Sequence, residues 1–182
     1  MEIILIRHGK PSAAINPKLS ASGFANWVLD YDESDVSCES LPPDALAKLI
    51  KDHFIISSHL ARSIDSVKKC LNAEPDLIHR KFREMEIPSY KLPFRLKAYT
   101  WLVVNRIAWF AGVNGNVESF KAAKLRAKNA AAGLMELASE HNKVAVFGHG
   151  LVNKSMANVL KKEGWHCTFE GKGYWSTINL RK

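Results

Sequence analysis

Four apolar segments of the chain end in side chains of the kinds that do chemistry: imidazole, guanidinium and carboxylate groups. Arg-His-Gly at positions 7–9 follows the run EIILI, and Gly-His-Gly at positions 148–150 follows KVAVF. The run FIISS continues through Ser58-His59-Leu60-Ala61 to Arg62, and LIHRKF leads into Arg83-Glu84-Met85-Glu86. These segments supply at least two imidazoles, two guanidiniums and a carboxylate.

Such a mixture suits phosphoryl transfer. A neutral imidazole is nucleophilic near pH 7 because its unperturbed pKa is about 6.5. Two arginine forks can hold the oxygens of a transferring phosphoryl group and neutralise their charge, and a second imidazole can donate to the same oxygens. A carboxylic acid can protonate the departing alkoxide, which is otherwise a poor leaving group. Gly9, Gly148 and Gly150 would let the backbone approach such a ligand closely.

The elements that must position these groups can be read from the apolar pattern. Uninterrupted apolar residues in EIILI and KVAVF are typical of strands covered on both faces, as in parallel sheets. Helical patterns lie between the strands, over 41–52, 60–71, 116–140 and 150–164, and Asn116 is the expected N-cap of the longest one, with Glu118 in its first turn. The predicted strands are Ile3–Ile6, Phe54–Ser57, Leu77–Phe82, Val144–Phe147 and Tyr174–Leu180.

Strands that alternate with helices predict a layered α/β fold with a largely parallel sheet. In such sheets ligands bind where the carboxyl ends of the strands meet the amino ends of the helices. The four functional segments should therefore converge at one edge of the sheet, and helices beginning after His59 and His149 would add amide groups suited to an anion.

These motifs resemble the histidine phosphatase superfamily, with its phosphoglycerate mutase-like fold, over nearly the whole chain. LIRHG matches the family's opening strand and Arg-His-Gly, KLSASGFANW matches a Leu-Thr-x-x-Gly-like element, and Ser58–Arg62 matches Ser-x-Leu-x-Arg. FREMEIP matches the acid-bearing segment, NVES echoes a helix start, and GHGL matches the final turn. The resemblance implies a single three-layer α/β/α domain over residues 1–182 of the family's small phosphatase branch.

The resemblance also implies roles for particular residues. His8 would be the nucleophile that becomes phosphorylated, Glu84 the proton donor and later the base, and His149 a further catalytic group. The phosphoryl group would be bound by Arg7, Arg62, Gly9 and Ser58. Neither a metal nor another cofactor is implied.

The sequence leaves the roles of several residues open. Glu86 competes with Glu84 for the acid role, although position favours Glu84. Ser58 could offer its hydroxyl to the phosphate or cap a helix. Arg126 stands where the family often has arginine, but we expect it only to cover its own helix.

Residues 86–116 lack the family's usual Gly-x-Trp-x-Gly and contain the aromatic-rich stretch KLPFRLKAYTWLVVNRIAWFAG. In the family this region commonly covers the active site and sets substrate choice. The alternatives are a pair of packed helices whose aromatic side chains fill the core, a dimer surface, or a contact with a membrane surface.

Composition narrows the class of protein. The basic residues exceed the acidic ones by 26 to 18, and the excess is concentrated between Lys91 and Lys128, which holds eight bases and one acid. The three cysteines are widely spaced and suggest neither a disulfide framework nor a zinc site. No apolar run is long enough for a signal peptide or a bilayer span, so a soluble, cytoplasmic protein is expected.

The favoured hypothesis is a metal-independent phosphatase acting on a phosphorylated small molecule or a phosphoprotein through phospho-His8. The missing Glu-Arg-His-Tyr-Gly-type segment argues against a glycolytic mutase, and Glu84 favours esters over phosphohistidine because an oxygen leaving group needs an acid. The rival hypothesis is a phosphate or polyanion binder without turnover. Nucleic acid is disfavoured as a partner because no nucleic-acid motif is present, and the sequence fixes no oligomeric state.

Overall fold

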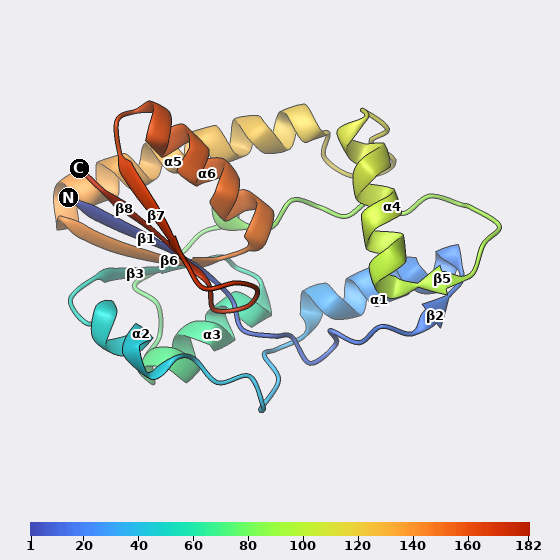
Figure 1. The fold of residues 1–182 in the computed structure, drawn as a ribbon, viewed down its shortest axis with the longest axis horizontal. Helices are drawn as coiled ribbons and strands as arrows, with labels where there is room; N and C mark the ends of the chain where they lie inside the picture. The colour runs from blue at the N-terminus through green and yellow to red at the C-terminus, as the bar shows by residue number, and fades with distance from the viewer.

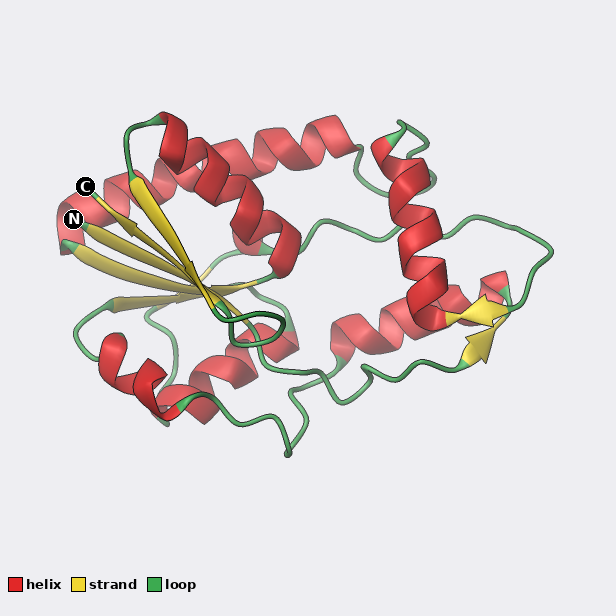
Figure 2. Ribbon diagram, in the orientation of Figure 1, coloured by secondary structure: helices red, strands yellow, loops and turns green.

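A twisted six-stranded sheet lies at the centre of the computed structural model, which describes residues 1–182 (Figures 1 and 2). Its strand order is β4-β3-β6-β1-β8-β7. The first four strands run parallel, β8 pairs antiparallel with β1, and β7 pairs antiparallel with β8. The strands are β1 (Glu2–Arg7), β3 (Phe54–Ser57), β4 (Leu77–Ile78), β6 (Lys143–Gly148), β7 (His166–Glu170) and β8 (Thr177–Arg181).

Alternation along β1 divides the core into two layers, because successive side chains of a strand point to opposite faces. Ile3 and Leu5 are buried in one apolar cluster with residues of α5 (Phe120–His141) and α6 (Gly150–Lys162). Ile4 and Ile6 are buried in a second cluster with α2 (Asp44–Leu49) and α3 (Ala61–Leu71). Figure 2 shows these helices on the two faces of the sheet, which confirms the three-layer α/β/α sandwich.

The remaining elements form a separate lobe with a small apolar cluster of its own. It consists of α1 (Ala21–Glu33), α4 (Ala98–Phe110) and a two-stranded ribbon of β2 (Lys18–Leu19) and β5 (Leu96–Lys97). In Figure 1 this lobe lies beyond the carboxyl ends of the parallel strands, on the side away from both termini. Its aromatic centre is formed by Phe24, Trp27 and Trp101.

Some predicted boundaries were wrong. The expected strand Leu77–Phe82 is only Leu77–Ile78, followed by a 3-10 turn at Arg80–Phe82, and the expected strand Tyr174–Leu180 is the shorter β8. The longest helix begins at Phe120 rather than after Asn116, because Ser119 caps it by accepting from the amide of Ala122 at 3.1 Å. Helix α1 and strand β7 were not predicted.

No helix of the structure combines the length and the apolar character that crossing a membrane requires.

Candidate active site

The carboxyl ends of three neighbouring strands bring the sequence motifs together. Arg7, the last residue of β1, is in register with Gly148, the last residue of β6. Beyond the strands, the amide of His8 donates to the carbonyl of Gly148 at 3.0 Å, and the amide of Ser58 donates to the carbonyl of Phe147 at 3.0 Å. The predicted convergence at one edge of the sheet is therefore found.

His8 is buried and held in one orientation. Its Nδ1 lies 2.7 Å from the carbonyl oxygen of Gly9. A carbonyl can only accept, so Nδ1 carries the hydrogen in the neutral ring and Nε2 keeps its lone pair. Burial, and then the nearby Arg62 guanidinium, hold the pKa of His8 well below its ordinary value of 6.5. The imidazole is accordingly neutral at pH 7, with Nε2 free to act as a nucleophile.

Arg62 faces that lone pair from the first turn of α3. Its Nε donates to His8 Nε2 at 3.3 Å, and its side chain is almost completely buried. The other end of the guanidinium donates to the carbonyls of Tyr31 and Asp32 at 3.1 and 3.3 Å, and it pairs with the Asp32 carboxylate at 3.0 Å. These contacts with α1 tie the arginine to the second lobe and fix the direction of its fork.

His149 lies beside His8. The two imidazole centroids are 5.0 Å apart with an edge-on arrangement. His149 is fully buried, and its Nε2 contacts the hydroxyls of Ser58 at 2.9 Å and Ser63 at 3.2 Å. Burial and then Arg62 lower the pKa of His149 well below 6.5, so this ring is also neutral at pH 7. Its Nδ1 has no partner within the protein.

Arg7 completes this group, and we call Arg7, His8, Arg62 and His149 together the cationic cup. Arg7 Nε lies 3.7 Å from the position a Cβ on Gly150 would take, next to His149, and the positive charge contributes to the lowered pKa of both histidines. The guanidinium lies 4.6 Å from the ring centre of Tyr174, and its Nε has no hydrogen-bond partner. The cup therefore contains two permanent positive charges with no carboxylate bonded to Arg7.

Two tyrosines that the sequence reading missed flank the cup. Tyr174 stacks on Arg7 and lies 5.8 Å from the ring of His8, while the ring of Tyr31 lies 4.9 Å from the guanidinium of Arg62. Burial raises the pKa of Tyr31, and the neighbouring Tyr174 raises it further, so the two phenols are close together. No motif marks these tyrosines because they come from α1 and from the turn between β7 and β8.

Glu84 is held at the amino end of α6. Its Oε1 accepts from the amides of Met85 at 2.9 Å and Val152 at 3.1 Å, and its Oε2 accepts from the amide of Leu151 at 3.3 Å. The carboxylate is thus fixed beside the turn that carries His149. Glu86 has other partners. Its carboxylate accepts from the amide of Glu118 at 2.8 Å and lies 3.6 Å from the guanidinium of Arg83.

Arg126 makes contacts beyond its own helix, which the sequence did not indicate. Its side chain is only 12% exposed and is paired with Glu118. It also donates to three carbonyls in and just before the acid-bearing segment, those of Lys81 at 3.0 Å, Arg83 at 2.9 Å and Glu84 at 3.3 Å. The expectation that Arg126 only covers its own helix was wrong, because the guanidinium fastens the segment that presents Glu84.

Gly9 and Ser58 also have defined surroundings. A Cβ on Gly9 would come within 2.5 Å of the Trp175 ring and 2.6 Å of Val36, so only glycine fits there. The amide of Gly9 donates to Ser66 Oγ at 2.9 Å. Ser58 bonds His149 and does not cap α3, whose N-cap residue is Leu60.

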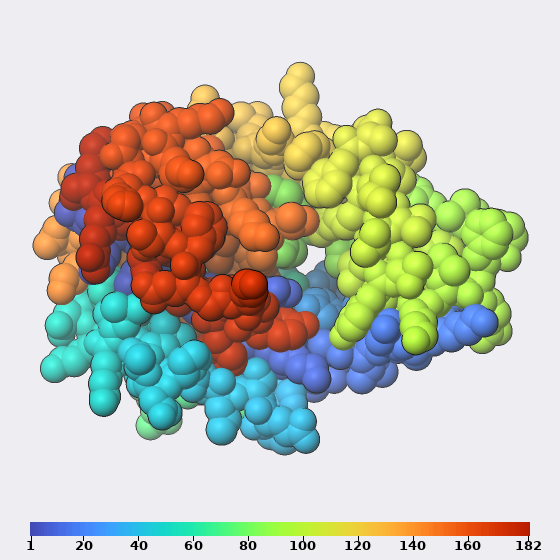
Figure 3. Space-filling model, in the orientation of Figure 1, coloured from blue at the N-terminus to red at the C-terminus, as the bar shows by residue number.

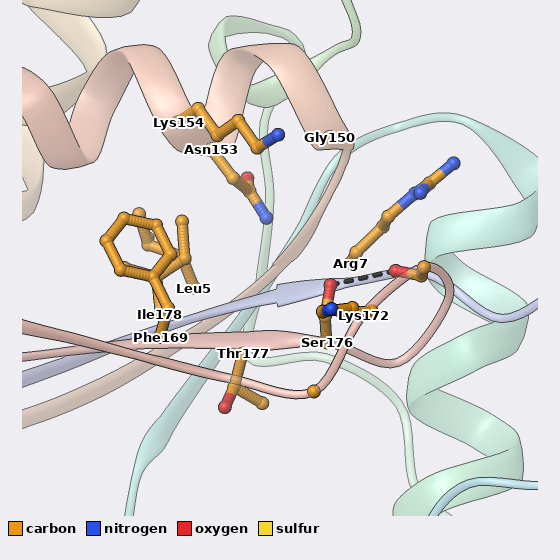
Figure 4. A pocket seen from close by; sticks show the side chains of 12 residues that line it. Leu5, Arg7, Gly150, Asn153, Lys154, Phe169, Lys172, Ser176, Thr177 and Ile178 are labelled. Atoms are coloured by element: carbon orange, nitrogen blue, oxygen red, sulfur yellow. Dashed lines mark hydrogen bonds between the residues drawn. The ribbon is translucent and has the colours of Figure 1, made fainter.

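A cleft of about 340 Å³ adjoins the cup at Arg7. It runs between α6 and the β7–β8 hairpin, and Figure 4 shows Arg7 at one end and Phe169 at the other. Lys154 and Lys172 also line it, and no acidic residue does. Figure 3 shows that the molecule is hollowed between the sheet domain and the lobe of α4.

Comparison with known proteins agrees with this geometry. The sequence model of the histidine phosphatase superfamily (branch 1) matches residues 3–166. No curated protein sequence matches the chain significantly.

Solved structures share the fold at low sequence identity. The product of an open reading frame of Mycobacterium tuberculosis is 16% identical, with a TM-score of 0.63 over 100% of this chain and 95% of that one. A phosphoserine phosphatase of Entamoeba histolytica, in complex with 3-phosphoglyceric acid, is 16% identical, with a TM-score of 0.60 over 98% and 89% of the two chains. A phosphoglycerate mutase of Bacillus anthracis is 18% identical, with a TM-score of 0.59 over 90% and 81%. With its Arg-His-Gly strand end, its second histidine turn and its phosphoglycerate mutase-like fold, the chain belongs to the histidine phosphatase superfamily.

Proposed function

We propose that this protein is a phosphatase that hydrolyses phosphomonoesters through a phosphorylated His8. The observation that carries the proposal is the Nε2 lone pair of a buried, neutral His8, which faces the Arg62 fork at 3.3 Å and lies beside His149. A nucleophile with a guanidinium at its attacking atom is an arrangement suited to an incoming phosphoryl group, whose oxygens take over the hydrogen bond.

The first half of the reaction transfers the phosphoryl group to the protein. Arg7, Arg62 and His149 bind the phosphoryl oxygens, assisted by Gly9 and Ser58. His8 Nε2 attacks phosphorus, the P–O bond to the leaving group breaks, and protonated Glu84 delivers its proton to the departing oxygen. The charge on the transferring group is neutralised by the two guanidiniums.

The second half regenerates the enzyme. Glu84, now ionised, accepts a proton from a water molecule as that water attacks phosphorus. The N–P bond breaks, the electron pair returns to His8 Nε2, and inorganic phosphate is released. Glu84 is preferred over Glu86 for both proton transfers because it adjoins the turn of His149, whereas Glu86 is engaged by Arg83 and by the amide of Glu118.

For the substrate we propose a phosphorylated small molecule or a phosphoprotein, with an ester favoured over phosphohistidine because Glu84 is available as the acid. The similar structures include a phosphoserine phosphatase and an ecdysone phosphate phosphatase, which supports ester hydrolysis as a class. Within residues 86–116, helix α4 belongs to the lobe that borders the hollow before the cup, and we propose that this lobe covers the bound substrate.

The test is turnover of p-nitrophenyl phosphate in the presence of EDTA, with His8→Ala as the blank. We expect turnover by the wild-type protein, none by His8→Ala, and an acid-labile, alkali-stable phosphoryl label on the wild-type protein after rapid quenching. If wild type and His8→Ala are equally inactive on esters and on phosphohistidine peptides, the rival assignment of a non-catalytic anion binder replaces this one.

A further inference from the structure

Helix α4 is apolar on the side that faces solvent. Tyr99, Val103, Ile107 and Phe110 are spaced four, four and three residues apart, so they lie along one face of the helix. Their exposed fractions are 41%, 58%, 63% and 46%. Surface helices of globular proteins normally present polar side chains outward. We call these four residues the α4 stripe.

The opposite face of α4 already provides its packing against the rest of the protein. Trp101, Asn105 and Trp109 are completely buried, and the indole of Trp109 donates to the carbonyl of Glu118 at 2.8 Å. Within the α4 stripe, Tyr99 donates to the carbonyl of Ala14 at 2.9 Å and Phe110 packs against Phe120, whereas Val103 and Ile107 are the most exposed of the four. The stripe extends over the 12 residues from Tyr99 to Phe110, or about 18 Å of helix. Its exposed apolar area carries a cost of roughly 25 cal/mol for each Å² that a partner could cover.

The charges around the stripe are positive at both ends. Lys97 directly precedes α4. At the other end, Phe110 packs against Phe120 at 4.9 Å, and Lys124 Nζ lies 4.8 Å from the ring centre of Phe120. The exposed bases of this part of the chain are Lys91, Arg95, Lys97, Lys121, Lys124 and Lys128.

No exposed acid from the same part of the chain balances these bases. Between residues 91 and 128 the one acidic residue is Glu118, whose side chain is 12% exposed and is paired with Arg83 and Arg126. The stripe is therefore apolar along its length and has a base near each end, Lys97 at one and Lys124 at the other. Symmetric docking of a second copy through this face would bring like charges together, which disfavours a two-fold dimer here.

We propose that the α4 stripe and its flanking bases form a docking surface for an anionic lipid bilayer. A helix lying in the plane of the bilayer surface inserts its apolar face to about 5–10 Å, while basic residues at its margins contact the phosphate headgroups. An anionic bilayer accounts for both the exposed apolar side chains and the flanking bases, because it covers the former and neutralises the latter. The inference does not depend on turnover.

The experiment is co-sedimentation of the full-length protein with two kinds of vesicle, one of phosphatidylcholine alone and one of equal parts phosphatidylcholine and phosphatidylglycerol. We expect binding to the anionic vesicles, loss of binding at high salt, and little binding to the neutral ones. Ile107→Asp should weaken binding by at least about tenfold, because a charge replaces an inserted side chain. Lys97→Gln should weaken it roughly fivefold.

Matched variants outside the lobe test whether any added charge, or any lost base, weakens vesicle binding to the same degree. Leu41→Asp changes a 73% exposed leucine outside the lobe, and Lys162→Gln removes an exposed base at the far end of α6; both should bind as wild type does. The melting temperature without vesicles should be the same for Ile107→Asp and wild type. Equal binding of Ile107→Asp and Leu41→Asp to the anionic vesicles overturns the proposal. The proposal is also overturned if no protein binds the vesicles and the wild-type protein instead self-associates in a way that Ile107→Asp abolishes.

Discussion

Arg62 donates from Nε to Nε2 of His8 across 3.3 Å, although 54 positions separate the two residues in the sequence. The contact joins the first turn of α3 to the residue after β1. Because the same guanidinium pairs with Asp32, it cannot turn away from the nucleophile without losing that ion pair. The geometry of the cup is therefore set before any substrate binds.

Replacing Arg62 by lysine should reduce kcat/KM for p-nitrophenyl phosphate by roughly 100- to 1000-fold, because the ammonium cannot reach both Asp32 and the phosphoryl oxygens with a planar fork. Steady-state kinetics with Arg80→Lys, an exposed arginine outside the cup, provides the control. A loss of less than about twofold in Arg62→Lys would remove this residue from phosphoryl binding.

Stability should decline in acid because of the buried histidines. The unfolded chain binds a proton at each imidazole near pH 6.5, whereas burial keeps the folded pKa of His8 and His149 well below that value. Below pH 6.5 the unfolded state therefore binds more protons, and stability present at higher pH is lost as the pH falls toward the folded pKa, by about 1.4 kcal/mol per pH unit for each histidine.

The measurement is urea unfolding between pH 7.5 and 5.5. His149→Asn should have a shallower dependence on pH than wild type, and His166→Asn, at an exposed site on β7, should match wild type. Parallel curves for all three proteins would show that folding does not lower the pKa of His149.

Glu84→Gln should slow substrates with poor leaving groups far more than activated aryl phosphates, because only the poor leaving groups need the proton. The comparison is kcat/KM for an alkyl phosphate and for p-nitrophenyl phosphate. Glu86→Gln serves as the matched variant, since its side chain lies two positions away and bonds to Arg83 and Glu118. A selective loss in Glu86→Gln alone would transfer the acid role to that residue.

Arg126→Met should destabilise the fold by about 3 kcal/mol, because it removes one of the two guanidiniums paired with the largely buried Glu118 and the donor to three backbone carbonyls. It should also lower kcat on alkyl phosphates with little change in KM, since the carbonyl of Glu84 loses a donor and the carboxylate loses its fixed position. Lys128→Met, exposed on the same helix, is the control for both the unfolding and the kinetic measurement. An unchanged kcat in Arg126→Met would limit the arginine to a role in stability.

Trp101→Ala should lower the free energy of unfolding by about 3–5 kcal/mol, because the indole is completely buried against Phe24 and donates to the carbonyl of Leu19 at 3.0 Å. The ranking of substrates should stay as in wild type. Thermal unfolding and a panel of phosphate esters measure the two effects. A reordered panel with an unchanged melting temperature would place Trp101 in substrate selection instead of the core.

Much of the fold follows from local pattern. The uninterrupted apolar runs of β1 and β6 predict buried parallel strands, and glycine beside histidine at their ends predicts a ligand-binding turn. The order of Arg7, His8, Arg62, Glu84 and His149 along the chain indicates the family without any coordinates. Helix α1 was missed, although Phe24, Trp27 and Val28 have the spacing of a buried helical face.

Only the tertiary structure decides which of these groups meet and what each one bonds to. Ser58 contacts His149 across 91 positions, and Glu84 contacts Val152 across 68. Such pairs depend on strand order and helix packing, which residue types in a local window do not encode. For the same reason, the different partners of Glu84 and Glu86, the contacts of Arg126 and the tyrosines beside the cup become visible only when α1, α5 and the hairpin turn are placed around one sheet edge.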